Sequence, residues 1–198
     1  MTNDIGIKII PAYELLAAYK CGMFPMANEK TGKINWYEPE KRAILPLYGL
    51  RISRNLNRRI KHKTYSVTFD KSFREVITNC SKRTTTWISD EIIESYQNLF
   101  SLGYVHSVET WKRKKLVGGL YGVSIGGAFF GESMFSVEVD ASKVALVKLV
   151  EHLNKKNFIL VDCQFMTSHL KSLGAIDIPK TEYLTLLSRA INLSTNFN

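Results

Sequence analysis

Three polar side chains, Glu132, Asp162 and Gln164, lie in stretches that are otherwise apolar. Glu132 belongs to residues 118–136 (GGLYGVSIGGAFFGESMFS), whose glycines and aromatic residues are typical of a hairpin that lines a pocket. Asp162 and Gln164 end a buried-strand pattern at residues 158–165 (FILVDCQF), where strand alternation places both side chains on one face. Two polar side chains would therefore sit together at the edge of a buried strand, beside the pocket. The alternative interpretation is that all three are ordinary polar groups at strand ends.

Basic residues are concentrated in two places along a chain whose formal net charge is +9. Residues 51–63 (RISRNLNRRIKHK) contain no acidic residue, and residues 112–115 (KRKK) have the pattern of a basic turn. Localised positive charge favours a partner that carries phosphate groups, and a solvated basic surface is the alternative. A helix over residues 51–63 would have one basic stripe and one packed side. The stripe would hold Arg51, Arg54, Arg58 and Lys61, and the packed side Ile52, Leu56 and Ile60.

The order of the expected elements indicates an α/β fold with two parts. Residues 1–50 predict a small N-terminal lobe with a helix and short strand-like runs. Residues 51–198 are expected to form a larger domain, in which strands form a meander. A long amphipathic helix at residues 141–156 then precedes a buried strand and a last helix. Asp140 is expected to cap the long helix. This layout resembles the GCN5-related N-acetyltransferase fold.

Several classes of protein are disfavoured by what the sequence lacks. No apolar stretch has the length of a membrane span, and the first residues (MTNDIGIKII) lack the features of a signal peptide, so we expect a cytoplasmic protein. The three cysteines form no CxxC pair, which favours buried thiols in a reducing compartment. The four histidines show no metal-ligand spacing with one another or with the cysteines, so we expect no metal.

Nine short motifs follow one another between about residues 11 and 188. They are LLAAYKCGMFP (15–25), WYEPEKRAIL (36–45), TWI (86–88), HSVE (106–109), LVGGLYG (116–122), FGESMFS (130–136), ASK (141–143), DCQ (162–164) and SLGA (172–175). In this order they closely resemble the bacterial leucyl/phenylalanyl-tRNA-protein transferase family. The resemblance implies an enzyme that moves Leu or Phe, with Met as a further donor, from aminoacyl-tRNA to the α-amino group of a protein that begins with Arg or Lys. It also implies N-end rule degradation of that protein, an acetyltransferase-like fold, no cofactor and a monomer.

The resemblance also assigns roles to positions of this sequence. It places the catalytic pair at Asp162 and Gln164, the pocket carboxylate at Glu132, and the tryptophan that stacks on the terminal adenosine at Trp87. The remaining substrate positions are an amino-acid pocket of Leu120, Phe129, Leu146, Leu149 and Val161, and a tRNA-binding cluster of Arg54, Arg58 and Lys61.

Three features depart from the family pattern. Met26 stands where the family commonly has a second aromatic residue for the adenosine, so that aromatic contact is either absent or replaced by a thioether contact. His62 stands at a position that is basic in the family, and the segment before Pro11 is shorter than usual. These departures bear on tRNA affinity more than on the chemistry.

The ester bond that is broken in this transfer sets the chemical requirements. An aminoacyl ester is already activated, and an α-amino group with a reference pKa of about 7.7 to 8.0 is partly neutral near pH 7, so alignment is the main task. Gln164 is expected to accept a hydrogen bond from the amine, and Asp162 to hold the Gln164 amide through its NH2 group. Glu132 and Asp162 are expected to attract the N-terminal Arg or Lys of the acceptor.

Two other functions compete with this interpretation. A coenzyme A dependent N-acetyltransferase normally carries a Gln/Arg-x-x-Gly-x-Gly/Ala loop, which this sequence lacks. A non-catalytic RNA-binding protein would explain the basic segments but not Asp162 and Gln164 beside an apolar pocket. The pocket residues, which recur at helical and strand spacings, could also be ordinary core. Transfer from Leu-tRNA or Phe-tRNA to a peptide, with acetyl-coenzyme A as the control donor, separates the three functions.

Overall fold

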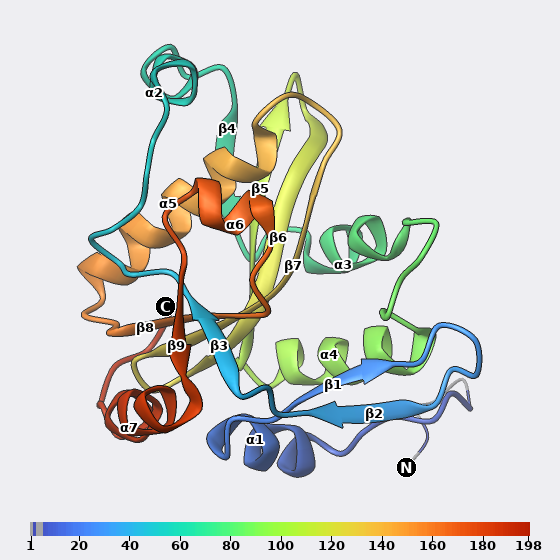
Figure 1. Cartoon of the computed structure of the whole chain (residues 1–198). Coiled ribbons are helices and arrows are strands. Elements are labelled where there is room, and N and C mark those ends of the chain that lie inside the picture. Colours follow the sequence, from blue (N-terminus) through green and yellow to red (C-terminus); the bar gives the residue numbers. More distant parts are fainter. Residues whose placement is uncertain (1, 3–5) are drawn as a thin grey trace.

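A seven-stranded sheet with helices on both faces forms the centre of the protein (Figure 1). The computed structural model describes residue 2 and residues 6–198. The sheet order is β4-β5-β6-β7-β8-β3-β9, and β1 and β2 form a separate hairpin. The strands are β1 (Phe24–Ala27), β2 (Ile34–Tyr37), β3 (Lys41–Ile44), β4 (Ser66–Phe69), β5 (Val105–Lys112), β6 (Lys115–Ile125), β7 (Ala128–Ser136), β8 (Leu160–Gln164) and β9 (Ile176–Pro179). The helices are α1 (Ala12–Lys20), α2 (Arg54–Lys61), α3 (Phe73–Ser81), α4 (Asp90–Ser101), α5 (Ala141–Lys155), α6 (Ser168–Ser172) and α7 (Lys180–Ile191). The α/β fold class expected from the sequence is confirmed.

The sheet opens between β7 and β8. Strands β4 to β7 form the expected antiparallel meander, and β8 returns parallel to β7 after the crossover through α5. The pairing of β7 with β8 covers only residues 128–130 of β7, whereas β7 continues to Ser136. A register shift between Tyr121 and Gly122 of β6 disturbs the ladder next to this point, where a bulge bends a strand. The last part of β7 therefore has an edge that β8 does not cover.

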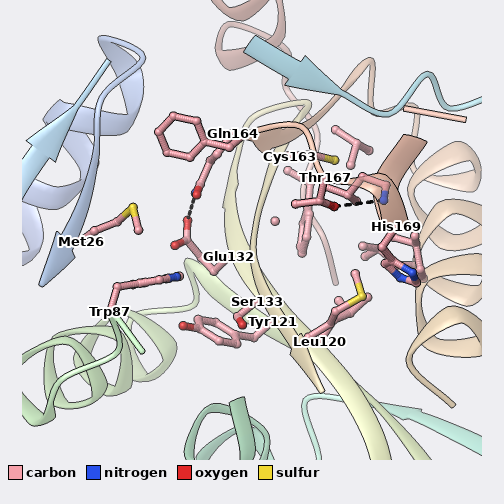
Figure 2. A pocket seen from close by; sticks show the side chains of 18 of the residues that line it. Met26, Trp87, Leu120, Tyr121, Glu132, Ser133, Cys163, Gln164, Thr167 and His169 are labelled. Carbon is pink, nitrogen blue, oxygen red and sulfur yellow. Dashed lines mark hydrogen bonds between the residues drawn. The ribbon is translucent and has the colours of Figure 1, made fainter. Parts of the chain in front are cut away.

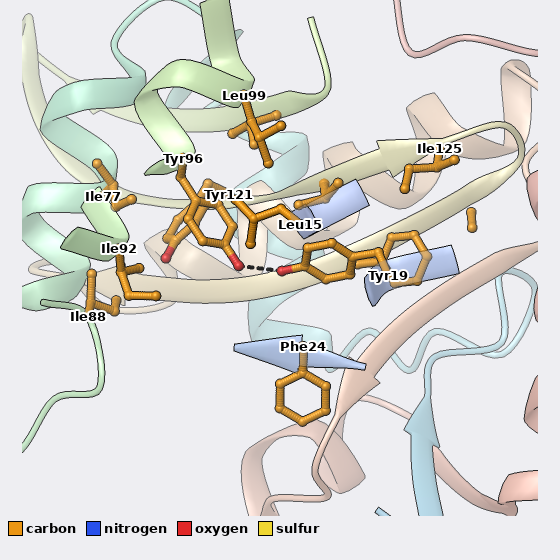
Figure 3. Close-up of a cluster of buried hydrophobic side chains, with 14 of the residues drawn as sticks. Leu15, Tyr19, Phe24, Ile77, Ile88, Ile92, Tyr96, Leu99, Tyr121 and Ile125 are labelled. Carbon is orange, nitrogen blue, oxygen red and sulfur yellow. Dashed lines mark hydrogen bonds between the residues drawn. The ribbon is translucent and has the colours of Figure 1, made fainter. Parts of the chain in front are cut away.

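Two apolar layers hold the helices on the sheet. The predicted long helix is confirmed as α5, and its apolar stripe packs on one face together with Phe129 and Val161. The short helix α2 packs beside α5 through Leu56. On the other face side chains of α1, α3, α4 and α7 form one apolar cluster with Tyr121 and Phe130. Figure 3 shows part of this cluster, with Tyr121 beside Tyr96. Because both faces of β7 and β8 are covered, side chains at the opening are held between the two layers.

The N-terminal part of the chain is joined to the sheet. Helix α1 and the β1–β2 hairpin lie beside the sheet, but β3, at residues 41–44, is paired between β8 and β9. This strand precedes the expected boundary at residue 50 and brings Arg42 into the catalytic domain. The division into residues 1–50 and 51–198 stays a prediction, and residues 1 and 3–5 of the expected lobe lie outside the described residues.

Some local expectations are wrong. Helix α2 begins at Arg54, because Ser53 is extended and its side chain accepts a hydrogen bond from the backbone N–H of Leu56. Arg51 therefore lies before the helix and off its stripe, and Ile52 is 43% exposed instead of packed.

Asp140 precedes α5 but does not cap it. Its backbone is left-handed, with a φ of 64°, and its carboxylate binds Arg59 and Lys143 instead. The expectation of buried thiols holds for Cys80 and is wrong for Cys21, which is exposed at the end of α1. Within the described residues, none of the helices is both long and apolar enough to cross a membrane.

Candidate active site

A cavity of about 450 Å³ lies where β7 and β8 separate (Figure 2). Its apolar walls come from β6, β7, β8 and α5, so the crossover helix closes the opening from one side. All the side chains expected to form the amino-acid pocket line it: Leu120, Phe129, Leu146, Leu149 and Val161. The volume is in the range of cavities that bind small organic groups. That these five side chains bind a substrate stays a prediction.

Glu132 is a buried carboxylate at the rim of this cavity. Its side chain is 9% exposed and accepts hydrogen bonds from the hydroxyl groups of Tyr19, at 2.6 Å, and Tyr96, at 3.2 Å. Gln164 donates a third, from Nε2 to Oε1 over 2.9 Å. Burial raises the pKa of Glu132 to about 7, although the hydrogen bonds from the tyrosines act in the opposite direction. The carboxyl group can therefore change its charge near neutral pH.

Gln164 ends β8 in a left-handed conformation, with a φ of 63°, which turns the chain toward α6. Its backbone N–H donates to Oδ1 of Asp162 over 2.8 Å, and its side-chain NH2 donates to Glu132. The expectation that Asp162 holds the side-chain amide of Gln164 is therefore wrong. The side-chain oxygen of Gln164 accepts no hydrogen bond from the described residues and is available to a ligand.

Asp162 is fully buried and does not line the cavity. Its carboxylate binds Arg42 at two points, from Nε over 2.9 Å and from Nη2 over 2.6 Å, and accepts a hydrogen bond from Tyr183 over 2.8 Å. The Arg42 guanidinium lies between the rings of Phe24 and Tyr183, 4.6 Å from each centroid. Because Arg42 neutralises Asp162, the expectation that Asp162 attracts the cation of an acceptor is wrong.

Met26 and Trp87 line the part of the cavity next to Glu132 (Figure 2). Met26 comes from β1, and Trp87 precedes α4. The backbone N–H of Ala27 donates to the Trp87 carbonyl over 3.1 Å, which ties the two segments together. The hairpin of the N-terminal part thus completes the cavity, and the two side chains are placed where a planar group could stack.

The basic stripe of α2 is separate from the cavity. Arg54, Arg58 and Lys61 are exposed, and none of them lines the cavity. Between them Arg59 pairs with Asp140 over 3.2 Å, which links α2 to the start of α5. The structure therefore places the expected tRNA-binding cluster on a surface beside the site and not within it.

Several residues of the site carried no recognisable signal in the sequence. Tyr19, Tyr96 and Arg42 read as core or surface positions, because their partners are far away in the chain. Tyr121 also lines the cavity, and its buried hydroxyl has no hydrogen-bond partner within the described residues. Among the described residues, no group of three or more His, Cys, Asp or Glu side chains could hold a metal ion.

Two family models match the chain in succession. Residues 11–40 match the leucyl/phenylalanyl-tRNA protein transferase N-terminal domain, and residues 44–188 match leucyl/phenylalanyl-tRNA protein transferase. Three relatives carry the name leucyl/phenylalanyl-tRNA--protein transferase. The relative from Ruegeria pomeroyi is 46% identical over 95% of this chain and 90% of its own. Those from Chlorobaculum tepidum and Afipia carboxidovorans are 47% and 48% identical, over 96% and 99% of this chain and 100% and 88% of theirs.

Solved structures show a more distant likeness. L-PGS from Bacillus licheniformis aligns with 90% of this chain and 70% of its own, with 10% identity and a TM-score of 0.46. A GCN5-related N-acetyltransferase-like protein from Streptococcus suis aligns with 70% of this chain and 57% of its own, with 12% identity and a TM-score of 0.40. These similarities are too weak to bear on the site.

The family models, the relatives and a cavity with a polar rim define an enzyme of the transferase class. The chain belongs to the leucyl/phenylalanyl-tRNA protein transferase family. This membership sets aside the non-catalytic RNA-binding protein and the coenzyme A dependent acetyltransferase as alternatives.

Proposed function

We propose that the chain transfers Leu or Phe, with Met as a further donor, from aminoacyl-tRNA to the α-amino group of a protein that begins with Arg or Lys. The observation that carries the proposal is the apolar cavity that ends at Glu132 and Gln164, in a chain of this family. The apolar part suits the donor side chain, and the polar rim suits an ester carbonyl, an amine and a cation.

The donor is held at two points of the cavity. Its side chain lies against Leu120, Phe129, Leu146, Leu149 and Val161, where burial of a Leu or Phe side chain contributes about 1.5 to 3 kcal/mol. Its terminal adenine stacks on Trp87 and contacts the thioether of Met26, and base stacking on an aromatic side chain contributes roughly 1 to 3 kcal/mol. The exposed Arg54, Arg58 and Lys61 bind phosphates of the tRNA body.

The reaction is an aminolysis of the ester. The amine nitrogen attacks the ester carbonyl carbon, a C–N bond forms, and the C–O bond to the ribose breaks as the amine proton passes to the ribose oxygen. Gln164 accepts a hydrogen bond from the amine through its free side-chain oxygen and so orients it. Asp162 acts as a positioning residue, because it holds the backbone N–H of Gln164 while Arg42 balances its charge.

Acceptor selection is assigned to Glu132. A protein with a net charge of +9 repels an N-terminal Arg or Lys unless a carboxylate stands in the site, and Glu132 is the carboxylate on the cavity rim among the described residues. In the cell, the product would enter N-end rule degradation. We expect a cytoplasmic monomer.

A transfer assay tests the proposal. Labelled Leu-tRNA or Phe-tRNA is mixed with a peptide that begins with Arg, and the matched peptide carries an acetylated α-amine. Label is expected on the first peptide and absent from the second, while acetyl-coenzyme A gives no product. Acetyl transfer, or no transfer from either aminoacyl-tRNA, would contradict the proposal.

A further inference from the structure

Arg83 is the one Lys or Arg that lines the cavity in the described part of the chain. It lies in the loop between α3 and α4, and its side chain is exposed. No acidic residue among those described forms an ion pair with it, unlike nearby Arg74, which binds Glu94 over 2.6 Å. A cation at a cavity mouth without a counter-ion favours an anionic ligand.

The Arg83 side chain is anchored at one end only. Its Nη2 atom donates to the backbone oxygen of Met134 over 2.5 Å. Met134 belongs to the part of β7 that has separated from β8, so its carbonyl lies at the opening of the sheet. Nε and Nη1 donate to no acceptor among the described residues. A guanidinium held in this way presents a free donor edge, which matches a phosphate group.

The position of Met134 along β7 indicates which phosphate this is. Beyond Ser136 the chain leaves β7 and reaches two basic side chains, since Glu138 pairs with Lys112 and Asp140 with Arg59. In the other direction β7 leads to Glu132 at the cavity rim. A strand rises about 3.3 Å per residue, so Met134 lies roughly 7 Å along β7 from Glu132. Arg83 is therefore held close to the polar rim of the cavity, in the same loop as Trp87.

We propose that Arg83 binds the phosphodiester group that joins the terminal adenosine of the donor tRNA to the preceding nucleotide. The inference rests on the proposed function, which places that adenosine against Trp87, another lining residue of the cavity. In this role Arg83 is a substrate-binding residue that raises affinity for the donor. It fixes the last nucleotide while the ester reaches Gln164.

Two small donors isolate the contact. One is adenosine esterified with phenylalanine, which has no phosphate, and the other is the same ester of adenosine 5′-monophosphate. The wild-type protein is expected to use the phosphorylated donor with a kcat/KM about tenfold higher, as one charge-assisted contact allows. Arg83→Ala removes this ratio and leaves transfer from the phosphate-free donor unchanged, whereas Arg83→Lys keeps part of it.

Lys82→Ala is the matched control. Lys82 is the neighbouring exposed cation. Its Nζ donates to Asn79 over 3.2 Å and it does not line the cavity, so its loss should keep the ratio. The inference is overturned if the wild-type protein uses both donors equally, if Arg83→Ala keeps the ratio, or if it slows both donors alike. Transfer from the phosphate-free donor by the wild-type protein supports the proposed function whichever result Arg83 gives.

Discussion

The side-chain amide of Gln164 donates to Glu132 over 2.9 Å, and this bond fixes which end of the amide is free. The nitrogen is engaged by the carboxylate, so the oxygen is left for an incoming amine. Tyr19 and Tyr96 hold the same carboxylate from the opposite layer, which prevents it from turning away. The orientation of the amide is thus set by a residue from another strand and not by its neighbour Asp162.

Replacing Gln164 should slow the transfer step. Gln164→Ala removes the hydrogen bond that orients the amine, and we expect a loss of about ten- to a hundredfold in single-turnover rate at saturating donor and acceptor. Cys163→Ala is the control, because Cys163 lines the same cavity but forms no hydrogen bond to Glu132. A Gln164→Ala protein that keeps the wild-type rate would show that the amide plays no part in the reaction.

The preference for basic acceptors should depend on pH. The pKa of Glu132 is raised to about 7 by burial, so the carboxyl group is mostly neutral below that pH and mostly charged above it. Only the charged form attracts a guanidinium, and the preference should therefore rise between about pH 6 and pH 8.

A pair of peptides measures this effect. One begins with Arg and the other with citrulline, which has the same shape without the charge, so the titration of the α-amine cancels in the ratio of their rates. We expect the ratio to rise about fivefold across the interval in the wild-type protein and to stay flat in Glu132→Gln. A ratio that does not change with pH in the wild-type protein would remove Glu132 from acceptor selection.

Asp162 should matter for folding as much as for activity. Asp162→Asn leaves Arg42 charged and buried without a counter-ion, and breaking a buried pair from one side costs about 3 to 5 kcal/mol. Urea unfolding measures the loss. Glu38→Gln, which breaks the surface pair with Lys180, should cost less than about 1 kcal/mol. Equal losses of unfolding free energy in the two variants would mean that the buried pair contributes no more to stability than the surface pair.

The regular elements could be read from the sequence because their signals are local. The apolar stripe of α5 and the β-branched run of β8 repeat within a few residues, and both elements are found within a residue or two of their expected bounds. The start of α2 was misplaced because the capping of a backbone N–H by Ser53 outweighed the helical stripe.

The site itself depends on contacts between residues far apart in the chain, which produce no periodic pattern in the sequence. Arg42 and Asp162 are 120 positions apart, and Tyr19 and Glu132 are 113 apart. Each partner alone resembles an ordinary surface or core residue. Asp162 was therefore expected to hold the amide beside it in the chain, whereas the fold supplies Arg42 from a strand that pairs with β8.

The basic surface of α2 should be visible in the salt dependence of donor binding. Arg54, Arg58 and Lys61 are exposed on one helix, and each phosphate contact adds roughly 0.7 to 0.9 to the slope of log affinity against log salt. Arg58→Ala should therefore lower the slope for aminoacyl-tRNA by about 1 and leave transfer from an aminoacyl adenosine unchanged. Lys30→Ala, in the β1–β2 loop at the far side of the molecule, removes the same charge and should not change the slope (Figure 1). If the two variants lower the slope equally, net charge and not the α2 surface governs binding of the tRNA.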